Sequence, residues 1–126
     1  MSVATLNFIS SLMKRLDIPC EFMRWTAPDP EEGYFFTYEY TELPTPTREE
    51  TGKQDISIIL RGFTRRSWLL LEQAKEKIEK SVAITAILPD GTGIAVFYDG
   101  ANPVPTGDAD FKSIKINLTI QEWKVN

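Results

Sequence analysis

Apolar residues recur three or four positions apart in two stretches of the chain, which is the spacing of one face of a helix. The first stretch is expected to end at Asp17–Ile18, because Pro19 lacks an amide hydrogen and restricts the residue before it. The second begins after Thr64 or Ser67, either of which suits an N-cap. The sequence therefore predicts two helices with these apolar stripes: Val3, Leu6, Ile9, Leu12, Met13 and Leu16, and then Leu71, Ala74, Ile78 and Val82.

Alternation of apolar and polar residues predicts the long strands, and a richness in strand-forming residues predicts one at Cys20–Trp25, where the alternation is poor. The longest are expected at Tyr34–Leu43, Gln54–Phe63 and Phe111–Val125, and shorter ones at Cys20–Trp25, Ala83–Leu88 and Gly93–Tyr98. The last strand alternates most regularly, with Ile114, Ile116, Leu118 and Ile120 on its inward face. This order predicts an α+β fold, in which a mostly antiparallel β-sheet carries two α-helices packed on one face and a long β-hairpin arm.

Two polar segments interrupt the pattern and are predicted to be exposed arms. Leu43–Lys53, read as LPTPTREETGK, has no periodicity and is longer than the usual hairpin connection. Asp99–Asp110 contains two prolines, and its aspartates do not match the spacing of a calcium-binding loop. Both segments are therefore candidates for contact with other molecules, since long loops often carry function.

The composition narrows the chemistry that this chain can perform. Its 126 residues are 42% hydrophobic and 25% charged, which predicts a single domain over residues 1–126. Histidine is absent, which removes catalytic and metal sites built on imidazole. Cys20 is the single cysteine, so we expect a buried apolar side chain and neither a disulfide nor a zinc site. With no phosphate-binding glycine motif either, we expect no cofactor, and an enzyme is the least supported class.

Charge and hydropathy give expectations about location and partners. Eighteen acidic residues against fourteen basic ones give a net charge of -4, which disfavours nonspecific attraction to nucleic acid. No apolar run has the length needed to cross a bilayer, and the first residues lack the charge order of a secretory signal. We therefore expect the chain to fold in the cytoplasm.

Two groups of side chains have both a functional and a structural interpretation. Arg61, Arg65 and Arg66 lie beside Trp68 at a predicted strand-to-helix corner, where they suit a phosphate contact or pairing with acidic residues within or between subunits. The strand Tyr34–Leu43 carries Tyr34, Phe36, Tyr38 and Tyr40 on one face. That face suits a ligand-stacking platform or a core and subunit interface, and the second interpretation is favoured because a tyrosine buries its ring readily.

The order of these elements resembles the tail terminator proteins of bacteriophages with long, non-contractile tails, of the lambda-like kind. The resemblance covers nearly the whole chain. In the first half of the chain it rests on the helix that stops at Leu16–Pro19, the strand Cys20–Trp25 with the proline break after it, and the aromatic strand Tyr34–Tyr40. In the second half it rests on the arm Leu43–Lys53, the strand Gln54–Phe63, the helix Ser67–Val82 and the closing strand that starts at Asp110–Lys112. Related neck and tail-completion proteins share this layout.

The resemblance implies a structural virion protein that forms a homohexameric ring on the tail tube. Such a ring ends tube polymerisation and offers a joining surface to the head connector, while genomic DNA passes through its lumen without specific binding. Contacts are expected from the two arms, and the candidate interaction residues are Arg48, Glu49, Glu50, Arg61, Arg65 and Trp68. The alternative is a module that binds a small ligand or peptide on the tyrosine-bearing sheet face.

Overall fold

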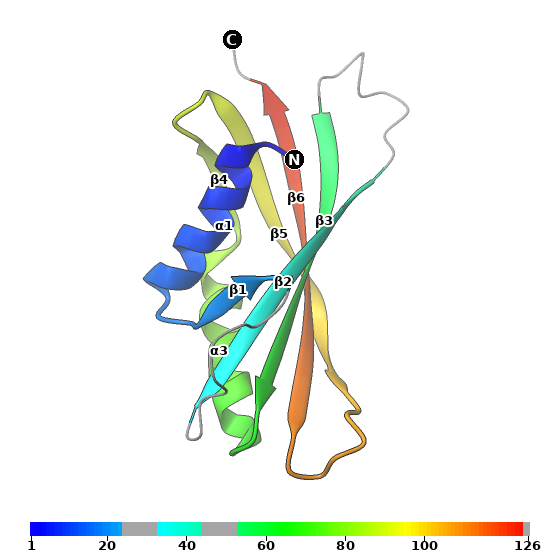
Figure 1. Ribbon diagram of the computed structural model, residues 1–126. Helices are drawn as coiled ribbons and strands as arrows, with labels where there is room; N and C mark the ends of the chain where they lie inside the picture. Colours follow the sequence, from blue (N-terminus) through cyan, green and yellow to red (C-terminus); the bar gives the residue numbers. More distant parts are fainter. Residues whose placement is uncertain (24–32, 44–52, 125–126) are drawn as a thin grey trace.

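The described part of the chain folds into a six-stranded sheet with two helices on one face (Figure 1). The computed structural model describes residues 1–23, 33–43 and 53–124. The elements are α1 (Val3–Arg15), β1 (Cys20–Phe22), β2 (Tyr34–Glu42), β3 (Lys53–Thr64), α3 (Trp68–Ser81), β4 (Ile84–Ile87), β5 (Thr92–Val104) and β6 (Lys112–Lys124). This confirms the predicted α+β class.

The sheet is mixed, with one parallel pair among antiparallel ones. Its order is β1-β2-β3-β6-β5-β4, and only the edge pair β1–β2 is parallel within the part of the chain that the structure describes. β2 and β3 form the predicted hairpin stem, in register from Tyr34↔Thr64 to Glu42↔Ile56. The arm that joins them lies largely outside the described residues.

Both helices start where a serine caps them. The Ser2 hydroxyl accepts a 3.1 Å hydrogen bond from the amide of Thr5, and the Ser67 hydroxyl accepts one of 3.2 Å from the amide of Leu69. Of the two N-caps predicted for the second helix, Ser67 is therefore the one used. Thr64 instead ends β3, where its hydroxyl donates to the carbonyl of Gly33.

The core lies between the helices and the inward face of the sheet. The predicted helical stripe of α3 is buried, and so are the alternating inward residues of β3 and β6. Burial of this much apolar surface is the main force that holds the two layers together. The central residues of the core are Leu71, Ala74, Ile78, Val82, Ile56, Ile58, Leu60, Ile114, Ile116, Leu118 and Ile120.

The tyrosine-bearing face of β2 belongs to this core. Phe36 and Tyr38 are 0% and 5% exposed, and the Tyr38 hydroxyl lies 3.0 Å from the hydroxyl of Ser10 on α1. Tyr34 and Tyr40 are half-buried and pack against the same cluster. The structure thus packs this face into the core instead of leaving it as an open platform.

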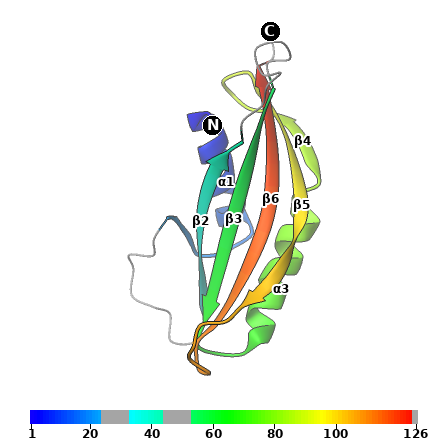
Figure 2. The same cartoon turned by 90° about the vertical axis from the view of Figure 1, so that its right-hand side faces the viewer.

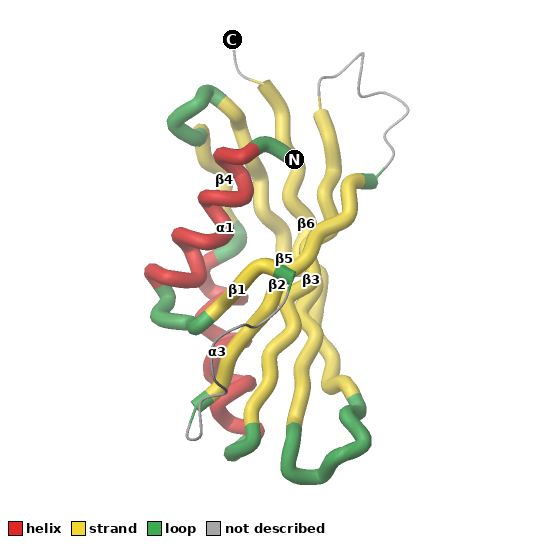
Figure 3. The backbone as a smooth tube through the Cα atoms, viewed as in Figure 1, coloured by secondary structure: helices red, strands yellow, loops and turns green. Residues whose placement is uncertain are grey.

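The prediction of an exposed arm over Asp99–Asp110 is wrong for its first half. β5 continues through Val104, and its register shifts between Tyr98 and Gly100, where a β-bulge accommodates Asp99. Gly100 adopts a positive φ of 113° at this bulge, which glycine tolerates. Pro103 is tolerated because β4 pairs with β5 only up to Val96, which makes the rest of β5 an edge strand. The loop itself spans only residues 105–111 (Figure 3).

The second face of the sheet carries no helix among the residues that the structure describes. In Figure 2 this face is turned to the viewer, with β2, β3, β6 and β5 side by side in front and α3 behind them. We call it the open face. It presents the outward residues of each strand.

No helix among the described residues is long and apolar enough to cross a membrane.

Candidate interaction surfaces

Arg61 lies on the open face, near the middle of the sheet. Its Nε donates a 3.1 Å hydrogen bond to Oε1 of Glu39 on the neighbouring strand β2, and the two side chains are 38% and 39% exposed. An ion pair this exposed adds little to stability, because water screens it and both side chains lose rotamer freedom. Arg61 therefore pairs with an acidic residue of its own chain, as one of the two interpretations expected. Only its Nε takes part in this hydrogen bond, and the side chain is otherwise partly exposed to solvent.

Arg65 covers one end of an aromatic stack. The rings of Phe35 and Phe63 lie 5.2 Å apart, those of Phe63 and Phe111 lie 5.6 Å apart, and the Arg65 guanidinium lies 4.7 Å from the centre of the Phe111 ring. Such stacking and the cation–π contact stabilise the start of β6 on β3. Arg65 thus has a structural task at the end of the open face.

Trp68 lies on the other side of the sheet, at the first turn of α3. Its indole N–H donates a 3.0 Å hydrogen bond to Oε1 of Glu72, whose other oxygen lies 2.8 Å from Nζ of Lys75. The Lys75 ammonium and then the Trp68 indole lower the pKa of the Glu72 carboxyl. Trp68 also lines an open hollow of about 480 Å³ beside the β5–β6 loop.

The structure therefore divides the predicted contact residues between two surfaces. Arg61 and Arg65 lie on the open face, and Trp68 belongs to the helical layer. Arg48, Glu49 and Glu50 lie outside the described residues.

Lys115 is a residue of the open face that the sequence interpretation missed. It lies directly opposite Arg61 across β3 and β6, and the row continues to Thr37 on β2 and Asn102 on β5. The sequence did predict that Lys115 points to the outward face of its strand. It did not predict that Lys115 lies opposite Arg61, because that depends on the register between β3 and β6.

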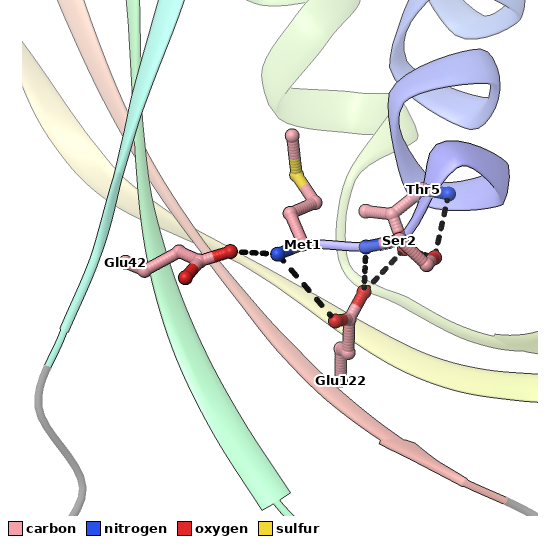
Figure 4. Close-up of polar contacts among 5 residues, drawn as sticks. All are labelled: Met1, Ser2, Thr5, Glu42 and Glu122. Atoms are coloured by element: carbon pink, nitrogen blue, oxygen red, sulfur yellow. Dashed lines mark hydrogen bonds and ion pairs between the residues drawn. The ribbon is translucent and has the colours of Figure 1, made fainter.

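A second missed cluster ties the start of the chain to the end of β6 (Figure 4). Glu122 accepts hydrogen bonds from the amide of Ser2 at 3.1 Å and the hydroxyl of Thr5 at 2.6 Å, and it lies 4.0 Å from the amine of Met1. That amine also contacts Glu42. The cluster fixes the first turn of α1 over the sheet, which is a structural role.

Two further findings concern the chemistry of the described residues. Among them, no three acidic or cysteine side chains come together in a way that could hold a metal ion. Cys20 is half-buried, and burial followed by the Glu21 carboxylate raises the pKa of its thiol to about 12. A thiol of this kind is a poor nucleophile at neutral pH.

Comparison with known proteins finds a shared fold. No family model matches the sequence, and no curated protein sequence does so either. A chain of the virion of a native gene transfer agent particle has the same fold, with a TM-score of 0.66 at 14% identity over 89% of this chain and 84% of that one. A second solved structure, which carries no functional description, matches with a TM-score of 0.59 at 12% identity over 99% of each chain. The fold of this chain therefore occurs in a virion protein.

Proposed function

We propose that this chain is a structural protein of a phage-like virion, and that it assembles as a ring that caps the tail tube. The observation that carries the proposal is the fold match to a chain of a gene transfer agent virion, which extends over 89% of the present chain. The sequence resemblance to tail terminators, which rests on different information, supports the same class.

The two-layered architecture suits this role. A ring requires a heterologous interface, in which one surface of each copy meets a different surface of the next. Here the helical layer and the open face of the sheet lie on opposite sides and differ in chemistry (Figures 1 and 2). Neighbouring copies can therefore pack in one direction around a closed ring, which we propose is a hexamer.

The proposed ring has two further partners and no catalytic task. One end of the ring would meet the tail tube, and the other would meet the head-completion or connector protein, while DNA passes through the lumen. The arm between β2 and β3 is the proposed contact segment for the tube. We place the protein at the head-proximal end of the tail and propose that it is not an enzyme.

The ligand-binding alternative receives less support from the same geometry. It requires an accessible tyrosine-bearing face, but Phe36 and Tyr38 of that face are buried, and the Tyr38 hydroxyl contacts Ser10 of α1. A bound small molecule would have to displace the residues that cover this part of β2.

A capping assay tests the proposal. Purified chain is added to polymerising tail tube protein from the same virion, and tube length and end-labelling are followed by negative-stain electron microscopy. We expect shorter tubes, each with label at one end. The control is the same tube protein polymerised without the chain. Tubes of unchanged length without end label would contradict the proposal.

A further inference from the structure

The open face carries two cations that face each other directly across neighbouring strands. Arg61 of β3 and Lys115 of β6 are register partners. Like charges in this position repel each other and destabilise the pair of strands. Glu39 contacts Arg61, whereas the Lys115 ammonium has no hydrogen bond or ion pair with any residue that the structure describes. An anion from outside the molecule would relieve this repulsion.

A row of three glutamates, which we call the acidic ridge, lies on α3. Glu72, Glu76 and Glu79 follow one another at spacings of four and three residues, which places them along one side of the helix. Glu76 and Glu79 are exposed, while Glu72 is already bonded to Trp68 and Lys75. Lys75 and Lys80 of the same helix flank the ridge, and the exposed carboxylates of Glu76 and Glu79 are the negative charges that it offers to the cation pair.

Within one copy the two surfaces cannot meet, because the sheet separates them. α3 packs on the inward face of β3 and β6 (Figure 1). The cation pair projects from the outward face of the same two strands, because Arg61 and Lys115 alternate with the buried residues Leu60, Ile114 and Ile116. In a side-by-side arrangement of copies, the open face of one meets the helical layer of the next. Both surfaces also present an exposed apolar side chain, Phe97 at 52% on the open face and Leu69 at 65% on α3.

We propose that the Arg61–Lys115 pair of one copy binds the acidic ridge of α3, Glu76 and Glu79 above all, on a second copy of this chain. The inference rests on the proposed function, since it specifies how copies join in the ring. The contact is heterologous, so successive copies repeat it in one direction until the ring closes. It is electrostatic, so assembly weakens as salt concentration rises.

Charge reversal on each side, alone and combined, tests the contact by sedimentation velocity of the full chain. We expect Lys115→Glu, and separately Glu76→Lys, to raise the concentration at which rings form by about ten- to a hundredfold. The combined variant Lys115→Glu/Glu76→Lys exchanges the signs of one ion pair and leaves Arg61 facing Glu79, so we expect its rings to form near the wild-type concentration. Circular dichroism of each variant establishes that the fold is kept. The matched control is Lys14→Glu, a charge reversal at an exposed position of α1.

The outcomes separate this inference from the proposed function. The proposed contact is overturned if both reversed variants form rings at the wild-type concentration, or if the combined variant does not recover ring formation. Either result leaves the proposed function, assembly as a ring, standing. Loss of binding to tail tubes with rings preserved would assign the cations to the tube and would equally overturn it. A wild-type chain that forms no ring would overturn the proposed function together with the contact.

Discussion

The hydroxyl of Thr5 donates a 2.6 Å hydrogen bond to the carboxylate of Glu122, which joins the first turn of α1 to the end of β6 across 117 positions of the chain. Thr5 is buried, and Glu122 also accepts from the amide of Ser2 (Figure 4). The capping and spacing patterns that predict this helix from the sequence give no indication of the contact with Glu122. It fixes where the helical layer begins over the sheet.

We expect Thr5→Val to destabilise the chain by about 1–3 kcal/mol, because it leaves a half-buried carboxylate without its closest donor while keeping the side-chain shape. Urea unfolding measures the difference. The control Ser11→Ala, at an exposed position on the same helix, should change the free energy of unfolding by less than about 0.5 kcal/mol. Equal effects of the two variants would argue against an anchoring role for Glu122.

Gly62 and Gly93 differ in how well they accept a methyl group. A Cβ on Gly62 would lie 2.5 Å from the ring of Phe36, which is fully buried, and a Cβ on Gly93 would lie 2.4 Å from the half-buried indole of Trp123. Because a buried ring has no room to move, we expect Gly62→Ala to cost about 2–3 kcal/mol and Gly93→Ala about 1 kcal/mol. Thermal unfolding of both variants checks the order. A smaller loss for Gly62→Ala than for Gly93→Ala would mean that Phe36 repacks freely.

The sequence predicted the elements whose pattern is local. The stripe Leu71, Ala74, Ile78 and Val82 and the alternation from Ile114 to Ile120 are buried as expected, because each records one face of one element. The second half of β5 was missed, since Gly100 and Pro103 are typical of loops and only the bulge and the edge position reconcile them with a strand.

Features that depend on contacts between distant segments could not be predicted from the sequence. The parallel pairing of Cys20 with Phe36 follows from how α1 returns the chain to the sheet edge. The opposition of Arg61 and Lys115 follows from the register of β3 and β6. For the candidate site, the sequence thus identified Arg61 but not Lys115, which lies opposite it and forms the cation pair.

The Cys20 thiol should react slowly in the folded chain. Burial and the Glu21 carboxylate raise its pKa from an ordinary value near 9 to about 12, so at pH 8 we expect alkylation to be about two to three orders of magnitude slower than in guanidinium. The folded rate should still rise with pH beyond pH 9, whereas the unfolded rate levels off there. A folded rate that also levels off near pH 9 would contradict the shift.

The same shift makes stability depend on pH in the alkaline range. Because the folded state holds the thiol proton more tightly, its contribution to stability is complete below about pH 9 and is lost as the pH rises toward 12. Burial, followed by the charges of Asp17 and Glu79 respectively, raises the pKa of Tyr34 and Tyr98 and acts in the same direction. Urea unfolding at pH 8 and pH 11 should show the loss, and Cys20→Ser should reduce the difference. A chain equally stable at both values would contradict it.

Sedimentation velocity of the purified chain over a hundredfold range of concentration, with negative-stain microscopy of the heaviest fraction, tests the central claim most directly. The account predicts a closed ring of fixed copy number, which we propose is six, and a sedimentation coefficient that no longer rises once the ring is complete. A monomer at every concentration, or filaments that lengthen without limit, would contradict the claim that this fold serves to assemble a closed virion ring.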